Sequence, residues 1–419
     1  MKVQHILSCG ICAVMLILAL TACQGPTGAE GPQGPKGDPG GGGGGGSNGG
    51  GSSGGYITLP HVHIWDEWVI TSAPTASTNG SERKTCTSCG TSETRAIPSS
   101  ITVRDLNGWN SALTTIRGGG NSQSYTICIL DDIIGVTQVY SGTINTAGFG
   151  TVTGLTVTLR GKGVLIKLDS GGNMFRLGSG QKLIIDGGLT LQPADRGEAI
   201  VYVQTGGILE LKDGTLTGNS ISASSTADGG GVYVDDGGDF IMNGGEISGN
   251  VVRTSSNNNS YYGSGGGVYV NERGTFTMNG GVISGNLART GSGSPSIGGG
   301  VCVYNGTFTM NGGEIGGNFA NNGGGVYVYN GTFTMNGGVI TGNNSTSNTN
   351  SSGGGVYVSS GTFRIANGTL YRNSANNGAE LYLDSAVAEY GTFNGSNWRR
   401  TGYLITTNNT IRVVNGVLQ

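Results

Sequence analysis

The chain has 419 residues, of which 85 are glycine and only 11% are charged, and its formal net charge is −3. So few charges, with no basic stripe among them, exclude the electrostatic footprint of a nucleic-acid-binding protein. We therefore expect no nucleic-acid partner.

The first 22 residues have the pattern of an export signal. Lys2 precedes an apolar run from Ile11 to Leu20, which ends in Leu20-Thr21-Ala22-Cys23. A run this short is typical of a signal-peptide core rather than a membrane-spanning helix. The segment resembles a bacterial lipoprotein signal. That implies cleavage before Cys23, a lipid on Cys23 that makes the membrane a partner, and export to the cell surface or outer membrane of a bacterium. The alternative is an ordinary secretory signal followed by an unrelated cysteine.

Residues 23–55 form a low-complexity segment after the lipidated cysteine. Glycine recurs at every third position from Gly25 to Gly40, and polyglycine with serine continues to Gly55. The first part is collagen-like by composition and period. We interpret the whole segment as a disordered, glycine-rich linker that holds the next module away from the membrane.

Residues 56–100 form a small module that is rich in His, Trp and Cys. Its candidate metal ligands are His61, His63, Cys86 and Cys89. Two imidazoles and two thiolates could make a tetrahedral zinc site, and Cys86 and Cys89 could equally form a disulfide. The module is similar to a short His/Trp/CxxC repeat of bacterial cell-surface proteins. A structural zinc ion is the one cofactor that we consider.

A short helix is predicted at about residues 105–117. The apolar residues on one face of this stretch are Leu106, Trp109, Leu113 and Ile116. A helix here can cover the open end of a β structure, where unpaired strands would otherwise invite aggregation. We expect residues 101–419 to form one parallel β-helix that begins with this capping helix.

One phrase occurs five times in the second half of the chain: GGGVYV, a short gap, GTFTMNGG, and an Ile-Ser-Gly-Asn ending, with small variations. The copies begin at Gly229, Gly265, Gly298, Gly323 and Gly353. Apolar residues recur at every second position within a copy, which is the period of β-strands, and glycines stand at the joints. Each copy therefore predicts three short strands, with like strands of successive copies paired in parallel. Insertions fall between the Gly-Asn that ends one copy and the triple glycine that opens the next, as in a stack of repeats. We call this position the variable corner.

Parallel stacking predicts columns of identical side chains. The expected inward columns are Phe240, Phe276, Phe308, Phe333 and Phe363, and Met242, Met278, Met310 and Met335. Two asparagine ladders are expected, which are Asn243, Asn279, Asn311 and Asn336, and Asn250, Asn286, Asn318 and Asn343. We interpret all four columns as structural.

The repeats resemble those of the chlamydial polymorphic outer-membrane proteins and related pectin-lyase-like proteins. The likeness is carried by Gly266-Gly267-Val268 and by Phe276 to Asn279, with their equivalents in the other copies, and covers about residues 229–367. It implies an all-β fold, a right-handed parallel β-helix, and a surface-exposed protein implicated in adhesion. The last clear copy departs from the pattern because Phe363 to Asn367 contains one extra residue.

Two surfaces are candidates for ligand binding. The first is the variable corner, which is rich in Ser, Asn, Gly and Tyr and where Tyr261 and Tyr262 are the candidate anchors. The second is an outward column of tyrosines whose rings could stack on sugars or only on one another. Its members are Tyr202, Tyr233, Tyr269, Tyr327, Tyr357 and Tyr382. We expect a monomeric β-helix with adhesin-like binding of host or neighbouring-cell glycans or proteins.

Two other functions compete with this expectation. Polysaccharide lyases and glycoside hydrolases of the pectin-lyase-like class use clustered carboxylates. Here Asp235, Asp236 and Asp239 are confined to one repeat, and Glu246 and Glu314 stand two repeats apart. We therefore expect no enzymatic activity, with a polysaccharide-degrading enzyme as the runner-up and a purely structural surface coat protein as the third possibility.

Overall fold

The computed structural model describes residues 69–72, 80–97, 99–137, 148–169, 171–194, 198–223, 227–254, 262–290, 295–345, 351–394 and 396–419. Within these residues the chain is mostly β, with strands β1 to β41 and one helix, α2 (Leu106–Gly118). The predicted all-β class is thus confirmed. The chain separates into two compact units, one that includes Gly80–Ile97 and one that includes Pro98–Gln419.

The first unit contains a three-stranded antiparallel sheet. Its strands are β1 (Val69–Ser72), β2 (Gly80–Thr85) and β3 (Ser92–Ile97), in the order β1-β2-β3. The turn between β2 and β3 is closed by the Cys86 N–H, which donates to Thr91 O at 2.7 Å. The CxxC sequence therefore lies in a hairpin turn.

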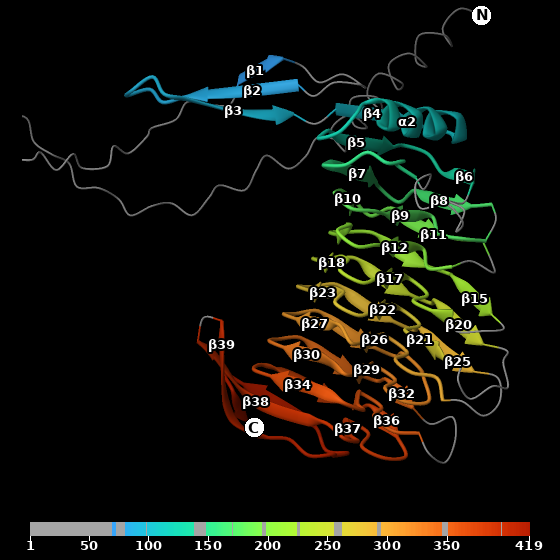
Figure 1. Ribbon diagram of the computed structural model, residues 1–419, viewed down its shortest axis with the longest axis vertical. Coiled ribbons are helices and arrows are strands. Elements are labelled where there is room, and N and C mark those ends of the chain that lie inside the picture. The colour runs from blue at the N-terminus through green and yellow to red at the C-terminus, as the bar shows by residue number, and fades with distance from the viewer. Residues whose placement is uncertain are drawn as a thin grey trace, which may run out of the picture. The chain divides into compact units, whose positions relative to one another are not determined.

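The second unit is built from three long sheets, which we call sheets 1, 2 and 3 (Figure 1). Sheet 1 contains β4 (Ser99–Val103), β5 (Ser124–Ile129), β7 (Leu155–Gly161), β10 (Gln181–Asp186), β13 (Ile208–Leu211), β18 (Asp239–Met242), β23 (Thr275–Met278), β27 (Thr307–Met310), β30 (Gly331–Met335), β34 (Gly361–Ile365), β38 (Val387–Asn394) and β39 (Asn397–Tyr403). Sheet 2 contains β6 (Ile133–Val136), β8 (Leu165–Leu168), β11 (Thr190–Gln192), β14 (Thr215–Thr217), β19 (Glu246–Ser248), β24 (Val282–Ser284), β28 (Glu314–Gly316), β31 (Val339–Thr341), β35 (Gly368–Tyr371), β40 (Ile411–Val414) and β41 (Val417–Leu418). Sheet 3 contains β9 (Phe175–Leu177), β12 (Val201–Val203), β17 (Val232–Val234), β22 (Val268–Val270), β26 (Val301–Tyr304), β29 (Val326–Tyr329), β33 (Val356–Val358) and β37 (Leu381–Leu383).

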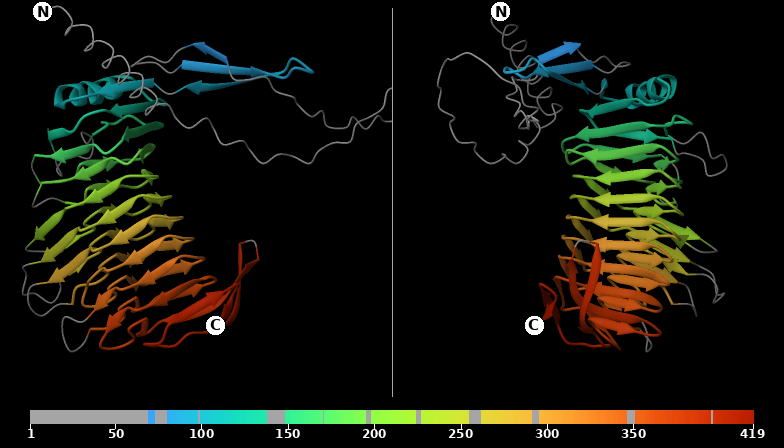
Figure 2. Two further views of the ribbon diagram at one scale, coloured as in Figure 1. Left: turned by 180° about the vertical axis from the view of Figure 1, so that it is seen from behind. Right: turned by 60° about the vertical axis from the view of Figure 1, so that its left-hand side comes forward.

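The chain visits the three sheets in rotation. Strands β17, β18 and β19 belong to sheets 3, 1 and 2, and the next three, after the corner, are β22, β23 and β24 in the same order. We call each such set a rung. Successive rungs pair in parallel and in register, so that Phe240 lies opposite Phe276 and Val232 opposite Val268. The views from behind and from the side show the rungs following one another in chain order (Figure 2). The parallel, in-register pairing predicted from the repeats is confirmed.

The predicted phenylalanine and methionine columns are also confirmed. All nine side chains are buried, and neighbouring phenylalanine rings stack with centroids 4.6 to 4.9 Å apart. Valines of sheet 3 and isoleucines of sheet 2 complete the same core. The interior is a continuous apolar column because each strand turns every second residue inward.

The two asparagine ladders differ in burial. Asn250, Asn286, Asn318 and Asn343 are fully buried, and each side-chain amide donates to the carbonyl of the next member at 2.9 to 3.0 Å, with Asn373 after Asn343. Asn373 in turn donates to Glu380 Oε2 at 2.6 Å, so that this carboxylate ends the buried ladder. The other ladder runs from Asn336 back to Asn243 at the surface, with donor and acceptor 2.7 to 2.9 Å apart. Both predicted ladders are confirmed.

Each of the three glycines that open a copy is explained by its own backbone angle or close contact. In the third copy, Gly298 has a φ of +62°, which favours glycine. A Cβ on Gly299 would lie 2.5 Å from Gly324 O of the next rung, and one on Gly300 would lie 2.7 Å from Gly325 O and 3.0 Å from Asn318 Nδ2. The second and third glycines therefore permit the close approach of neighbouring rungs at this corner.

The variable corner contains more strand than predicted. The ends of its inserted segments pair in parallel in three small sheets. These are β15 (Ser220–Ala223), β20 (Val251–Thr254) and β25 (Leu287–Thr290); β16 (Ala227–Asp228) and β21 (Gly263–Ser264); and β32 (Asn344–Ser345) and β36 (Ser374–Ala375). Val252 and Ala288 are buried side by side in the first of these. From the sequence these segments were interpreted as loops. Their alternation of apolar and polar residues is nevertheless a signal for strands.

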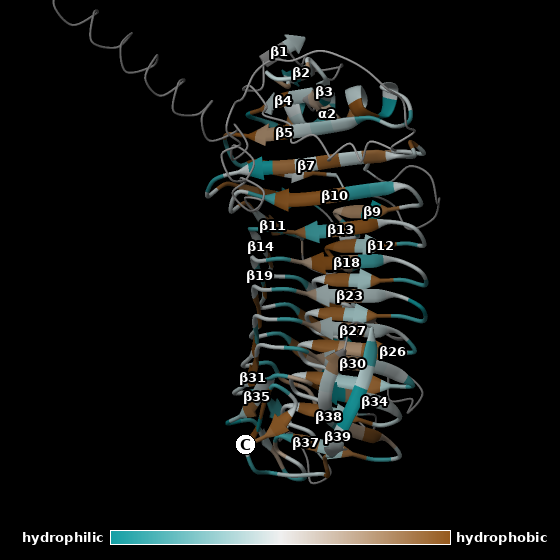
Figure 3. Cartoon of the chain, turned by 90° about the vertical axis from the view of Figure 1, so that its left-hand side faces the viewer, coloured by the Kyte–Doolittle hydropathy of each residue, from teal (hydrophilic) through white to brown (hydrophobic). Residues whose placement is uncertain are grey.

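The two ends of the second unit are closed differently. Helix α2 begins at the N-cap Asp105, whose side chain accepts from the Gly108 N–H at 2.7 Å, and it buries Trp109, Leu113 and Ile116. The predicted helix is thus present. At the other end the chain reverses, because β38 pairs with β39, and β40 with β35 and β41, in antiparallel fashion. The hairpin of β38 and β39 lies over the outer side of the preceding sheet 1 strands β27, β30 and β34 (Figure 3).

Candidate functional site

The outer face of sheet 3 carries the predicted tyrosine column. Val232 and Val234 point into the core, so Tyr233 between them points outward, and the same holds in the other rungs. Tyr202, Tyr233 and Tyr269 stack with centroids 4.8 and 5.1 Å apart, and Tyr327, Tyr357 and Tyr382 with centroids 5.0 and 4.9 Å apart. The structure therefore brings the tyrosines of this face together in two groups, separated by Cys302.

The ring faces in this column are covered by one another. Arg176 covers the first ring, with its guanidinium carbon 4.5 Å from the Tyr202 centroid. Tyr269 and Tyr327 are only 8% and 9% exposed, because Ile297 and Cys302 fill the space between them. Mutual stacking, one of the two alternatives for this column, is confirmed. A ligand meets the ring edges and hydroxyl groups of this face, and binding by these residues stays a prediction.

Burial raises the pKa of several tyrosine hydroxyls on this face, which are protonated at neutral pH in any case. It raises the pKa of Tyr357 to about 12, with a smaller contribution from the negative charge of Asp384. Burial also raises the pKa of Tyr233 and Tyr269, and nearby ionisable groups add to the effect. The hydroxyls of this face can therefore donate hydrogen bonds over the whole physiological pH range.

A second outward column beside the tyrosines was missed by the sequence analysis. It occupies the position after each VxV and contains Gln204, Asp235, Asn271, Tyr304 and Tyr329. Tyr304 and Tyr329 stack with centroids 5.0 Å apart, and Tyr304 is 37% exposed, which makes it more accessible than Tyr269 or Tyr327. The sequences Val301–Tyr304 and Val326–Tyr329 already indicate this column. Alternate residues of a strand point to the same side, so the fourth residue of each points outward like the second.

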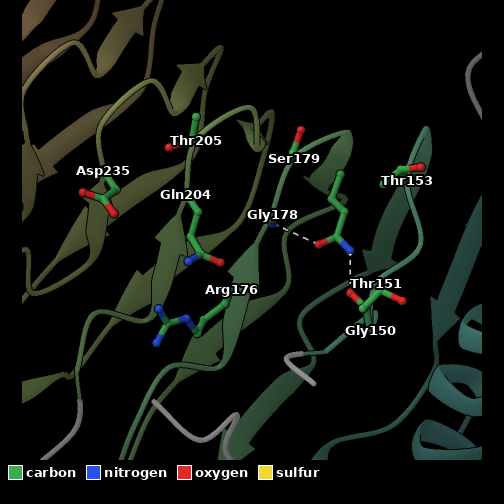
Figure 4. A pocket seen from close by; sticks show the side chains of 10 residues that line it. Gly150, Thr151, Thr153, Arg176, Gly178, Ser179, Gln204, Thr205 and Asp235 are labelled. Carbon is green, nitrogen blue, oxygen red and sulfur yellow. Dashed lines mark hydrogen bonds between the residues drawn. The ribbon is translucent and has the colours of Figure 1, made fainter. Parts of the chain in front are cut away.

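A pocket of about 390 Å³ lies at one end of the second column (Figure 4). Arg176, Gln204 and Asp235 come from successive rungs and line it together with hydroxyl groups of neighbouring turns. Asp235 is held in place by the Tyr202 hydroxyl at 2.7 Å and by Asn271 Nδ2 at 3.0 Å. The pocket thus offers a cation, an anion and an amide within one small surface.

A second pocket, of about 330 Å³, lies beside the first two tyrosines of the column. It is lined by Tyr202 and Tyr233 and by two carboxylates, Glu198 and Asp228. Burial raises the pKa of Asp228 to about 7, and a hydrogen bond from Ser264 opposes this shift. Neither carboxylate was singled out from the sequence, because Asp228 stands just before the repeated phrase and Glu198 lies upstream of its first copy.

The predicted carboxylate cluster has a structural explanation. Asp236 forms an ion pair with Arg273 of the next rung, and Asp239 accepts a hydrogen bond from Thr275. Together with the contacts of Asp235, these interactions join neighbouring rungs along the outer surface. Arg273, the basic partner of Asp236, was not singled out from the sequence.

Of the two corner tyrosines, Tyr262 is described and Tyr261 lies outside the described residues. Tyr262 is 36% exposed. The pKa of Tyr327 is raised by burial, with a smaller contribution from Tyr262, which places the corner close to the tyrosine face. The two surfaces predicted separately therefore adjoin one another.

The CxxC of the first unit occupies the turn after β2. Cys86 is buried and its Sγ lies 3.1 Å from Ser88 Oγ, whereas Cys89 is exposed and donates to Thr91 Oγ1 at 3.2 Å. Within the described ranges, no cluster of three or more histidine, cysteine or carboxylate side chains is placed to hold a metal ion. His61 and His63 lie outside those ranges, so the zinc site and the disulfide both stay predictions.

The signal peptide, Cys23 and the glycine-rich linker also lie outside the described residues. The part of the chain that the structure describes contains no helix with the length and hydropathy that crossing a bilayer requires. Comparison of the chain with models of protein families, with curated proteins and with solved structures finds no match. The function must therefore be argued from the surfaces themselves.

Proposed function

We propose that this chain is an exported, lipid-anchored, right-handed parallel β-helix that binds glycans or proteins of a host or neighbouring cell through the outer face of sheet 3 and its variable corner. The helical architecture is supported by the rotation of the chain through three sheets and by the in-register pairing of the rungs. A lipid on Cys23 would make the membrane the second partner, and the glycine-rich linker would separate the binding face from it.

One observation carries the binding function: two pockets lie beside Tyr202, of which one is lined by Tyr202 and Tyr233 and the other by Asp235, the hydrogen-bond acceptor of the Tyr202 hydroxyl. They combine carboxylate, guanidinium, amide and hydroxyl groups with tyrosine edges. A few converging polar groups beside aromatic side chains are typical of ligand sites. The adjoining corner has the Ser, Asn and Tyr composition of adaptable recognition loops.

The test is binding of the full chain, purified in detergent, to an array of glycans and extracellular-matrix proteins. Hits should weaken at least tenfold in Tyr304→Ala/Tyr329→Ala, which removes the exposed ring of Tyr304 and the Tyr329 ring stacked on it, and after shortening residues 255–260, which spares the paired ends of the corner. Thr307→Ala, on the outer face of sheet 1, is the control. Undiminished binding by both altered chains would contradict the proposed face.

A second candidate function, cleavage of a polysaccharide, is favoured by one specific feature. Asp228 shares its pocket with Glu198, and its pKa of about 7 would keep it protonated as a general acid near neutrality. Incubation with a panel of polysaccharides separates the two functions. Binding alone releases no new reducing or unsaturated ends, whereas ends released by the wild type and lost in Asp228→Asn would establish the enzyme.

A further inference from the structure

A separate cleft of about 700 Å³ lies between the outer face of sheet 1 and the C-terminal strands. Thr309, Thr334 and Arg364 of β27, β30 and β34 form one wall, and Phe393 of the β38–β39 hairpin and Asn415 of the β40–β41 turn lie opposite. We call this the hairpin cleft. Its volume is within the range of small-molecule sites.

The hairpin cleft is held open by fixed contacts. Beyond Tyr390 the register of β38 shifts, and the chain continues past the end of β34 as an antiparallel hairpin. The Asn415 N–H donates to Asn367 Oδ1 at 2.6 Å, which ties the β40–β41 turn to the adjoining rung. Glu389 accepts from Trp398 Nε1 at 2.7 Å and from Arg400 Nη1 at 3.2 Å, which ties the two strands of the hairpin together. A site that is already formed binds its ligand without an ordering cost.

One hydrogen-bond acceptor in the cleft has no partner in the structure. Asn336 is the last member of the surface ladder, and its Nδ2 donates to Asn311 Oδ1 at 2.9 Å. The next rung has Ala366 at the ladder position, because the extra residue of this repeat moves the asparagine to position 367. Asn336 Oδ1 is therefore buried without a hydrogen bond. Such a group costs free energy unless a bound molecule or water satisfies it.

Arginine replaces threonine at the cleft. Arg364 lies opposite Thr334 in the ladder of sheet 1, where the three preceding rungs have threonine. Its Nε is 3.5 Å from Glu389 Oε2 and makes no hydrogen bond. Arg364 and Arg400 share the single carboxylate of Glu389, so one positive charge of this network is not compensated. Nε itself is buried, but the Arg364 side chain is 35% exposed and lines the cleft, so its Nη groups are the donors for an incoming oxygen acceptor.

An aromatic ring completes the cleft. Phe393 is 39% exposed and packs on Trp398 with centroids 4.9 Å apart. Unlike the rings of the tyrosine column, it belongs to a hairpin outside the stacked rungs. It therefore offers an apolar surface beside the unpaired acceptor and the arginine.

We propose that the hairpin cleft binds a pyranose glycan, with one sugar hydroxyl donating to Asn336 Oδ1, a neighbouring oxygen accepting from the Arg364 guanidinium, and the ring packing against Phe393. A ligand with closely spaced donors and acceptors and an apolar ring surface, as a pyranose has, satisfies all three groups at once. This inference rests on the proposed function, in which glycans or proteins are ligands, and it adds a site and a chemical class to that function.

The experiment measures binding of neutral and uronate-containing oligosaccharides to the full chain by calorimetry and by the change in tryptophan emission. Asn336→Ala is expected to raise Kd about fivefold to tenfold, and Phe393→Ala at least about tenfold. Arg364→Thr, which restores the residue of the other rungs, should weaken uronates more than neutral sugars. The matched control is Asn279→Ala, the same change within the same surface ladder but away from the cleft.

The outcomes separate this site from the face of sheet 3. Weakened glycan binding in the cleft variants, with Asn279→Ala unchanged and the emission change lost in Trp398→Phe, establishes the cleft. Glycan binding that only Tyr304→Ala/Tyr329→Ala weakens would overturn the cleft and leave the proposed function intact. Binding of proteins but of no oligosaccharide would do the same. A chain that binds nothing on the arrays would contradict both.

Discussion

Asparagine occurs in two columns of this chain, and because one column is buried and the other exposed, we expect the two to contribute differently to the free energy of unfolding. Asn286 Oδ1 accepts from the backbone N–H and from the Nδ2 of Asn250, both at 3.0 Å, and its own Nδ2 donates to Ile247 O at 2.9 Å. Asn279 makes comparable amide contacts at an exposed position. Water can replace the contacts of Asn279 but not those of Asn286.

Asn286→Ala is therefore expected to lower the free energy of unfolding by about 2 to 4 kcal/mol, because it leaves several buried polar groups unpaired. Asn279→Ala should cost about 0.5 kcal/mol. Urea denaturation followed by circular dichroism compares the two variants. Equal shifts of the two denaturation midpoints would show that burial does not determine how much a ladder asparagine contributes to the free energy of unfolding.

Asp228 makes the stability depend on pH. Burial raises its pKa from 3.8 to about 7, so the folded chain retains a proton that the unfolded chain loses between these values. The contribution of Asp228 to stability is therefore greatest below about pH 4, falls as the pH rises towards 7, and is lower at pH 8 by up to about 4 kcal/mol. Asp228→Asn should remove this dependence and melt at a higher temperature than the wild type at pH 8, with little difference at pH 4. Parallel melting curves of the two proteins at both pH values would refute the assignment.

Among the elements, the sheet 1 strands contribute the aromatic core. Phe308 is fully buried and stacks on Phe276 and Phe333 at 4.6 Å on each side. Phe308→Ala should reduce the free energy of unfolding by about 3 to 5 kcal/mol because a cavity opens between two rungs. Phe308→Leu, which keeps an apolar side chain but loses the stacking, should fall between Ala and wild type. Denaturant midpoints rank the three proteins, and a leucine variant as unstable as the alanine variant would indicate that ring stacking dominates over burial.

The strands of the regular rungs could be predicted from the sequence, and the ends of the stack could not. Period 2 and the repeated phrase determine which residues face inward, so the Phe, Met and Asn columns follow from alignment of the copies with one another. The hairpin cleft depends on Ala366 and Arg364, which depart from the repeat, and on antiparallel pairings outside the repeats, of which that of β35 with β40 joins residues far apart in the chain. Such pairings leave no periodic signal. Similarly, Glu198 and Asp228 meet only because two corners fold beside the same tyrosines.

At the scale of the whole molecule, the rungs are interchangeable. Deletion of residues 301–325 joins Gly300 to Val326, which stands at the same position of the next copy, and it leaves every remaining rung with an equivalent neighbour. The shortened chain should fold, with the same circular dichroism spectrum per residue. Deletion of residues 301–313 would bring the next strand into the wrong sheet and should give an aggregated or unfolded product. Analytical ultracentrifugation and circular dichroism distinguish these results.

The buried ladder also has a direction. Each asparagine amide from Asn250 to Asn343 donates to the rung that follows it in the chain, and the Glu380 carboxylate receives the last donor. The last rung of such a ladder carries an amide donor whose acceptor belongs to residues further along the chain. Glu380 supplies that acceptor, so a chain truncated between residues 373 and 380 would leave the Asn373 amide open.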